Sequence, residues 1–307
     1  MTMTNKAVRV IDPILTTHAQ GYRQQEMVGS ALFPRVPVGV SGGQVLEFGK
    51  EAFRLYNARR APGANTKRID FGYLGKPFAL VQDALEGKLP IEHIRNANQV
   101  PNIQLGQRSV NTVMRSLMLA LEVEQAGIAR NPNNYDTDHK VDLSAAKWSS
   151  ESGDPAKDVR AGREAIRETI GVYPNTLLIS AKAFSAASEN PKVLERFKYT
   201  SSDSVTAEML ARLMDVDRVV VGKAVSADAQ GNFSDVWGAD AVLAYVAPEA
   251  TSIEEPSFGY TYTLEGHPLV EQAYYDNSAK SWIYPVTMER SPVLTGITAG
   301  FLFQNAG

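Results

Sequence analysis

The sequence predicts a mixed α+β fold, and three observations lead to that prediction. Apolar residues recur every three or four positions over residues 102–130, which is the spacing of one buried helical face. From residue 258 onward, aromatic and aliphatic residues alternate with polar ones, which is the period of a β-strand. Between these regions the predicted helices and strands follow neither an internal repeat nor a regular strand–helix–strand alternation. A doubly wound sheet and a barrel are therefore poor fits.

The first 82 residues predict an arm followed by a long loop. We expect residues 1–40 to form an N-terminal arm, with a short helix over 18–30 and then an extended edge segment. The edge position follows from Pro34 and Pro37, because proline has no N–H to donate within a central strand. Residues 41–82 predict an extended loop, whose two strands span 43–76 and meet at the turn-rich stretch APGAN. Few apolar residues are available to anchor its tip.

A long helix is expected over residues 102–130. Its apolar stripe predicts a side that faces the core, and the polar stretch NPNN at 131–134 predicts where the helix ends. The stripe consists of Val110, Val113, Met114, Leu117, Met118 and Leu121.

The middle of the chain predicts a second helical unit built around a short strand. Asp154 and Pro155 are typical of an N-cap and a first helical residue, and Gly171 is typical of the left-handed residue that ends a helix. The stretch TLLIS at 176–180 predicts a short buried strand. We expect further helices over 181–189, 191–197 and 204–214, strands over 218–221 and 241–246, and β-structure from 258 to 303.

The composition excludes several classes of protein. The chain has 307 residues, of which 44% are hydrophobic and 21% charged, so it is long and apolar enough for one large domain or two modest ones. A formal charge of −3 argues against a protein that mainly grips nucleic-acid phosphates. Because cysteine is absent, disulfides, thiol catalysis and thiolate metal sites are excluded. We see no signal peptide and no stretch long enough to span a membrane, and we expect assembly in the cytoplasm.

No catalytic motif is present in the sequence. Phosphate-binding and dinucleotide-binding glycine loops, the serine elbow and the paired-histidine zinc motif are all missing. The best candidate for a metal or general-base site is the polar stretch with Asp136, Asp138 and His139, for which a solvated turn is the simpler interpretation. A serine triad assembled in space remains open, but nothing in the sequence favours it. We therefore predict no catalytic, cofactor-binding or metal-binding residues.

The near-neutral total charge hides two opposed segments. Residues 47–76 carry seven Lys or Arg against three Asp or Glu, a net charge of +4, whereas residues 224–279 carry nine Asp or Glu and no Lys or Arg. A basic hairpin with little core of its own favours a partner, which we predict to be the acidic surface of an identical subunit. Nucleic acid and plain solvation of both segments are the alternatives. The candidate contact residues are Arg54, Arg59, Arg60, Lys67 and Arg68 in the loop, and Glu254, Glu255 and Glu265 in the acidic segment.

Four short stretches, together with the order of the elements, resemble a known family. They are IDPIL at 11–15, GVYPNTLLIS at 171–180, ENPKVLERFKY at 189–199 and VWGADAVLAYV at 236–246. In this order they are similar to the major capsid proteins of tailed bacteriophages, which have the Hong Kong 97-type capsid fold. The resemblance covers roughly residues 10–304. These are packing motifs, so their order carries the resemblance.

The resemblance implies a division of the chain and a function. Residues 1–40 would be the N-terminal arm, 41–82 the extended loop, 83–139 and 251–307 the peripheral domain with its spine helix at 102–130, and 140–250 the axial domain. Such subunits would form pentamers and hexamers of an icosahedral head that encloses double-stranded DNA without sequence-specific binding. We expect no cofactor, no membrane partner, a portal, and a separate scaffolding protein, because little chain precedes Ile11. A bacterial nanocompartment shell and a soluble α+β enzyme are the alternative functions.

Overall fold

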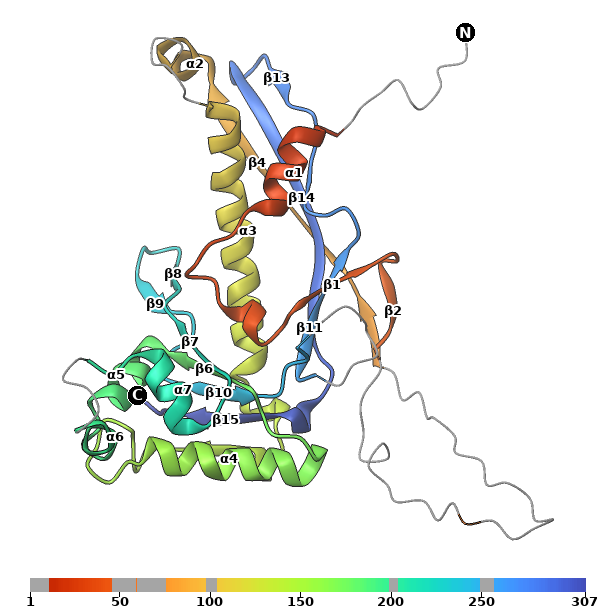
Figure 1. Cartoon of the computed structure of the whole chain (residues 1–307). Coiled ribbons are helices and arrows are strands. Elements are labelled where there is room, and N and C mark those ends of the chain that lie inside the picture. The colour runs from red at the N-terminus through yellow and green to blue at the C-terminus, as the bar shows by residue number, and fades with distance from the viewer. Residues whose placement is uncertain (1–10, 46–58, 60–75, 98–103, 199–203, 249–256) are drawn as a thin grey trace.

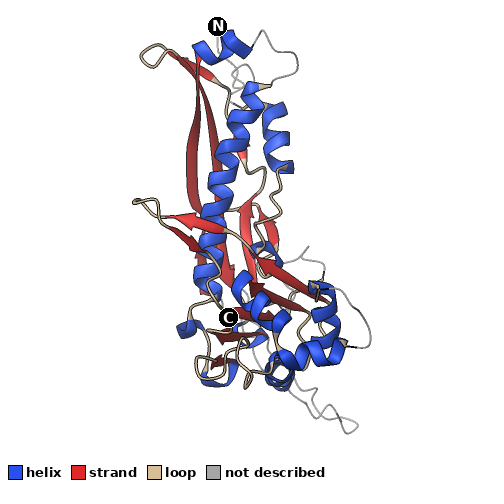
Figure 2. Ribbon diagram, turned by 90° about the vertical axis from the view of Figure 1, so that its left-hand side faces the viewer, coloured by secondary structure: helices blue, strands red, loops and turns tan. Residues whose placement is uncertain are grey.

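The molecule is elongated, and one long helix runs along most of its length (Figures 1 and 2). The computed structural model describes residues 11–45, 59, 76–97, 104–198, 204–248 and 257–307. Two larger sheets organise these residues, a six-stranded sheet beside the long helix and a five-stranded sheet at its C-terminal end. This mixture of helix and strand confirms the predicted α+β class.

The six-stranded sheet is built around its longest strand, β14, which pairs with β4 over ten residues on one side. On its other side β14 pairs in turn with β11, β12 and β13. Among the described strands β1 pairs only with β11 and lies at the edge, as Pro37 within it and Pro34 before it predict. The strands are β1 (Arg35–Val38), β4 (Val81–Pro90), β11 (Gly259–Leu264), β12 (Leu269–Val270), β13 (Tyr274–Asp276) and β14 (Ser281–Leu294).

The predicted long helix is confirmed as α3 (Leu105–Ala129). Its apolar stripe packs on β14, where Val286 and Met288 are buried against Val110, Met114 and Leu117. Burying each such side chain contributes roughly 1.5–3 kcal/mol, so this seam accounts for much of the helix's stability. The short helix α2 (Ile91–Ala97) precedes α3.

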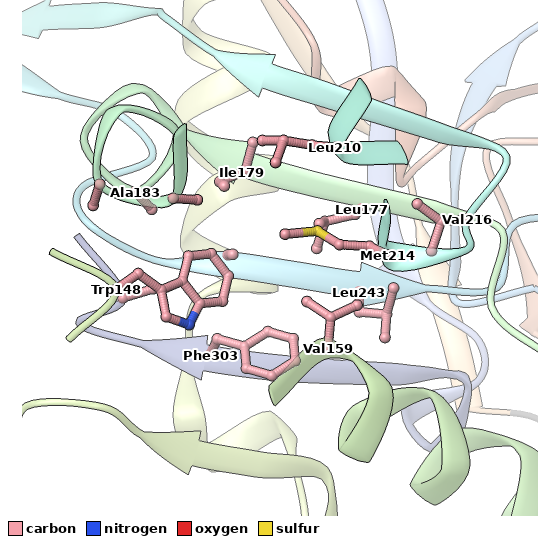
Figure 3. Close-up of a cluster of buried hydrophobic side chains, with 14 of the residues drawn as sticks. Trp148, Val159, Leu177, Ile179, Ala183, Leu210, Met214, Val216, Leu243 and Phe303 are labelled. Atoms are coloured by element: carbon pink, nitrogen blue, oxygen red, sulfur yellow. The ribbon is translucent and has the colours of Figure 1, made fainter. Parts of the chain in front are cut away.

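The five-stranded sheet is buried on both faces. Leu177 and Ile179 of β6 point to one face and Leu178 to the other, because successive side chains of a strand alternate. Figure 3 shows the first face, where Trp148, Phe303 and residues of the helices meet. The order is β5-β15-β10-β6-β7, with β5 (Lys140–Asp142), β6 (Thr176–Ser180), β7 (Arg218–Gly222), β10 (Ala241–Ala244) and β15 (Gly300–Gln304).

Four helices cover the face drawn in Figure 3, and local signals set their limits. The first of them, α4 (Pro155–Ile170), begins where the carboxylate of Asp154 accepts from the N–H of Lys157 at 3.1 Å. It ends at Gly171, whose φ of 72° is left-handed. Both predicted ends of this helix are therefore confirmed. The helices are α4 (Pro155–Ile170), α5 (Ala181–Glu189), α6 (Pro191–Phe197) and α7 (Ala207–Met214).

The arm helix differs from the prediction over 18–30. It is α1 (Pro13–Gly21), and it begins where Oδ1 of Asp12 accepts from the N–H groups of Ile14 and Leu15, both at 3.0 Å. Only the short 3-10 helix η1 (Gly29–Ala31) forms in the second half of the predicted range. The prediction was wrong because it passed over this cap.

The predicted loop is described mainly at its base. β2 (Gly42–Val45) pairs antiparallel with β3 (Lys76–Ala79), and residues 46–58 and 60–75 lie outside the described residues. A separate hairpin is formed by β8 (Val225–Ala227) and β9 (Phe233–Asp235). The C-terminal strand β15 pairs with β5 and β10, so it lies with the strands of 140–250 and not with those of 251–294.

Candidate subunit-contact surfaces and the junction that orients them

A buried carboxylate on α3 lies where the arm meets both sheets. Glu122 is 2% exposed. Its Oε1 accepts from the backbone N–H of Val28 at 3.0 Å and from Nε1 of Trp237 at 2.6 Å. Its Oε2 accepts from the N–H of Gly29 at 2.8 Å. One side chain therefore joins the helix to the arm and to the segment that leads into β10.

The surroundings of Glu122 make its burial tolerable. Burial raises the pKa of its carboxyl, and the three N–H donors oppose that effect by favouring the charged form. A Cβ at Gly29 would overlap the ends of the Gln125 and Glu122 side chains, so a larger residue there would have to displace both of these buried groups. Gln125 is also buried, and its Nε2 donates to Oγ1 of Thr261 in β11 at 2.9 Å. We call this set the buried junction: Val28, Gly29, Glu122, Gln125, Trp237 and Thr261.

Two arginines extend the connections of α3. Arg130, directly after the helix, pairs through Nε with Oδ2 of Asp240 at 2.6 Å. Arg290 in β14 is 2% exposed, and its guanidinium pairs with Asp83 at 2.9 Å and with Glu124 at 3.3 Å. Burial lowers the pKa of Arg290, an effect that the two carboxylates oppose. The helix is thus tied by charge to both sheets, which fixes the orientation of one sheet relative to the other.

Of the eight predicted contact residues, the structure describes two. Arg59 and Glu265 are both exposed. The backbone N–H of Glu265 donates to the carbonyl O of Val38 at 2.9 Å, so Glu265 lies near the strand that leads into the loop of its own chain. The other six lie outside the described residues: Arg54, Arg60, Lys67, Arg68, Glu254 and Glu255.

The described acidic residues of 224–279 are spread over several parts of the molecule. Asp240 pairs with Arg130, and Asp235 pairs with Lys182 at 2.8 Å. Asp228 lies in the turn of the β8–β9 hairpin, and Asp276 is the last residue of β13, an element far from that hairpin in Figure 1. A segment that is uniformly acidic in sequence therefore does not form one continuous acidic surface among the described residues.

The stretch with Asp136, Asp138 and His139 forms a structural contact. The carboxylate of Asp136 caps the 3-10 helix η4 (Thr137–His139), and its Oδ1 lies 2.6 Å from Nδ1 of His139. His139 is buried, and its Nε2 lies 3.2 Å from Oγ1 of Thr169 on α4. These contacts hold η4 against α4. Among the described residues, no group of three or more His, Asp or Glu side chains is placed to hold a metal ion.

The sequence reasoning missed the buried junction and Arg290. One signal was available for Glu122 and Gln125, because both fall on the helical face that carries Leu117 and Leu121. A polar side chain at a core position predicts a buried partner, though it does not say which. The same signal was available for Arg290, because it follows Val286 and Met288 at two-residue spacing on the buried face of β14.

None of the helices that the structure describes has both the length and the apolar character needed to cross a membrane.

The chain is 36% identical to the major capsid protein of Burkholderia phage BcepMu, over 96% of this chain and 96% of that protein. The chain belongs to the phage major capsid proteins. A family model described as phage major capsid protein E also matches residues 133–254. As a capsid protein, it is a structural component of the phage virion.

Comparison with solved structures agrees with this family. A phage-related protein from Bordetella bronchiseptica RB50 is 55% identical over 98% of each chain, with a TM-score of 0.85. The capsid of Cyanophage P-SCSP1u gives a TM-score of 0.55 at 10% identity, covering 89% of this chain and 86% of that one. The encapsulin of Synechococcus elongatus PCC 7942 gives 0.54 at 14% identity, covering 99% and 91%. The predicted Hong Kong 97-type fold is confirmed, and the sequence relationship places the chain with phage capsids.

Proposed function

We propose that this capsid protein assembles into the pentamers and hexamers of an icosahedral phage head, and that its role is structural and not enzymatic. The supporting observation is its relationship to a phage major capsid protein along almost the whole chain. The buried junction fits such a role, because a shell of repeated contacts needs subunits whose two sheets keep one relative orientation. Double-stranded DNA would be held by enclosure, without sequence-specific contacts.

In this proposal, the extended loop of residues 41–82 makes the contact that sets the register between neighbouring subunits. The base of the loop packs on β11 of its own chain, since the ring centroids of Phe78 and Tyr262 lie 4.6 Å apart. Its two ends are also joined, because the N–H of Leu80 donates to the carbonyl O of Ser41 at 2.8 Å. The basic residues Arg54, Arg59, Arg60, Lys67 and Arg68 would lie on the acidic residues Glu254, Glu255 and Glu265 of a neighbour. Complementary charge selects the partner and the register, and repetition around the shell multiplies modest contacts.

The division into capsid domains belongs to the same proposal. We assign residues 83–139 and 251–307 to a peripheral domain and 140–250 to an axial domain, with β15 reaching across to complete the axial sheet. A separate scaffolding protein, a portal and assembly in the host cytoplasm complete the proposed pathway.

The likeness to an encapsulin supports a nanocompartment shell as the second candidate. Double-stranded phage DNA inside particles isolated from a lysate favours the head, and an enclosed enzyme without DNA favours the nanocompartment.

The loop contact is tested by reversing charge at Arg59, Arg60 and Arg68. We expect the triple Glu variant to lose regular shells in negative-stain electron microscopy when it is coexpressed with its neighbouring phage genes. Lys substitutions at Glu254, Glu255 and Glu265 should restore the shells. The matched control reverses three cations that are exposed elsewhere, Lys147, Arg160 and Arg212, and should leave assembly intact. Unchanged shells in the loop variant would show that charge does not direct this contact.

A further inference from the structure

The β8–β9 hairpin has the features of a docking element. It forms a two-stranded sheet of its own, outside the two larger sheets (Figure 1). Phe233 is 77% exposed and Val225 is 46% exposed, so both strands present apolar side chains to solvent. A lone two-stranded hairpin is only marginally stable in water, and burying these side chains against a partner would stabilise it.

A cavity of about 460 Å³ opens between β4 and the N-terminal half of α3. Its apolar lining includes Leu85, Leu105 and Val113, and Leu85 is 45% exposed. Among the described strands β4 pairs only with β14, so the cavity lies at an open sheet edge. Lys88 and Arg108, both exposed, also line it. The carboxylate of Glu86, which lines it too, accepts from the hydroxyl of Tyr274 at 3.3 Å.

We propose that the β8–β9 hairpin of one subunit docks into this cavity on a second copy of the chain, with Phe233 seated between β4 and α3. Charge complementarity favours this occupant. The hairpin itself, residues 225–235, contains no Lys or Arg, and Asp228 is exposed in its turn. The cavity offers Lys88 and Arg108, which fit that carboxylate. Because hairpin and cavity are different surfaces of one chain, the contact is heterologous and repeats from subunit to subunit until a ring closes.

This contact is independent of the proposed docking of the extended loop. It uses no residue of 46–75 and none of the glutamates assigned to that contact, so either contact can fail while the other holds. It also gives a role in assembly to Phe233 and Asp228, which belong to none of the buried clusters of the described residues.

Engineered cysteines test the contact directly, because the chain has no cysteine of its own. Particles carrying both Phe233→Cys and Leu85→Cys should give, on oxidation, a ladder of covalent multimers in a non-reducing gel. Each single variant and the pair Phe233→Cys with Leu194→Cys, which is 48% exposed on α6, should remain monomeric. The pair Ser226→Cys and Ser234→Cys verifies the oxidation within one chain, since the two Oγ atoms lie 3.4 Å apart. A monomer band in the test pair, or a ladder in Phe233→Cys alone, would overturn the proposal.

Charge exchange tests the pairing of Asp228 with Arg108. Asp228→Lys and Arg108→Glu should each raise the concentration for half-maximal assembly by about fivefold, the size expected for an exposed pair, and the double variant should return it to near the wild-type value. Phe233→Ala should raise it about thirtyfold, as for the loss of a central aromatic contact, whereas Leu194→Ala should leave it unchanged. If the double variant is as defective as the sum of the singles, the hairpin does not meet this cavity.

Discussion

Replacing Glu122 by alanine should destabilise the free subunit by about 2–4 kcal/mol. The substitution leaves the N–H of Gly29 and Nε1 of Trp237 buried without their acceptor, and each such donor costs about 1–3 kcal/mol. The two donors together would cost about 2–6 kcal/mol. The substitution also removes a carboxylate that is itself costly to bury, as its raised pKa indicates, so we expect the lower half of that range. The control Glu168→Ala, at a side chain that is 71% exposed, should cost about 0–1 kcal/mol.

Urea unfolding followed by tryptophan fluorescence measures both variants, and hydrogen exchange at the amides of Val28 and Gly29 locates the damage. The pH dependence gives a second test. Because the pKa of Glu122 is raised in the folded subunit, its titration stabilises the fold most below the ordinary pKa of glutamate, and that stabilisation is lost as pH rises through the folded value. The difference in free energy of unfolding between the wild type and Glu122→Ala should therefore narrow from acid toward neutral pH. The reasoning would be refuted if Glu122→Ala lost no more unfolding free energy than Glu168→Ala, or if its difference from the wild type widened toward neutral pH.

Three further perturbations have definite expected outcomes. Phe303→Ala removes a fully buried ring from the cluster in Figure 3 and should cost about 3–5 kcal/mol in urea unfolding; a cost near zero would mean that this face is loosely packed. Gly162→Val places a Cβ 2.9 Å from Cζ of Phe303 and should lower the melting temperature, with an expected cost of about 1–3 kcal/mol; an unchanged melting temperature would contradict the close approach. Burial acts to raise the pKa of Asp136, but its hydrogen bonds with His139 outweigh that effect and lower the pKa. In melting experiments the wild type should therefore be more stable than Asp136→Asn at neutral pH, and this difference in stability should disappear as pH falls through the lowered value. A difference that persists in acid would contradict this account.

Local signals explain which elements the sequence could predict. The long helix and the helix between Asp154 and Gly171 have both a clear apolar period and cap residues, and their observed bounds agree closely with the predicted ones. The arm helix was misplaced because the cap at Asp12 decides its start, while the residues after it carry little period.

Long-range contacts explain what the sequence could not predict. Glu122 and Trp237 are 115 positions apart, so only the folded chain shows that they meet. The acidic segment of 224–279 shows the same limit, since among the described residues Asp235 and Asp240 pair with Lys182 and Arg130 of their own chain. A net charge counted along the sequence therefore does not say which of its carboxylates remain available to a second subunit.

The position of β15 constrains when a subunit becomes able to join a shell. This strand lies between β5 and β10, yet the ribosome makes it after all the other strands of that sheet. Until residues 300–304 emerge, β5 lacks its neighbour in the sheet, and Val159 and Ile166 of α4 lack Phe301 and Phe303 to pack against. A nascent or truncated chain therefore cannot complete the five-stranded sheet, and we expect only the finished chain to be competent for assembly.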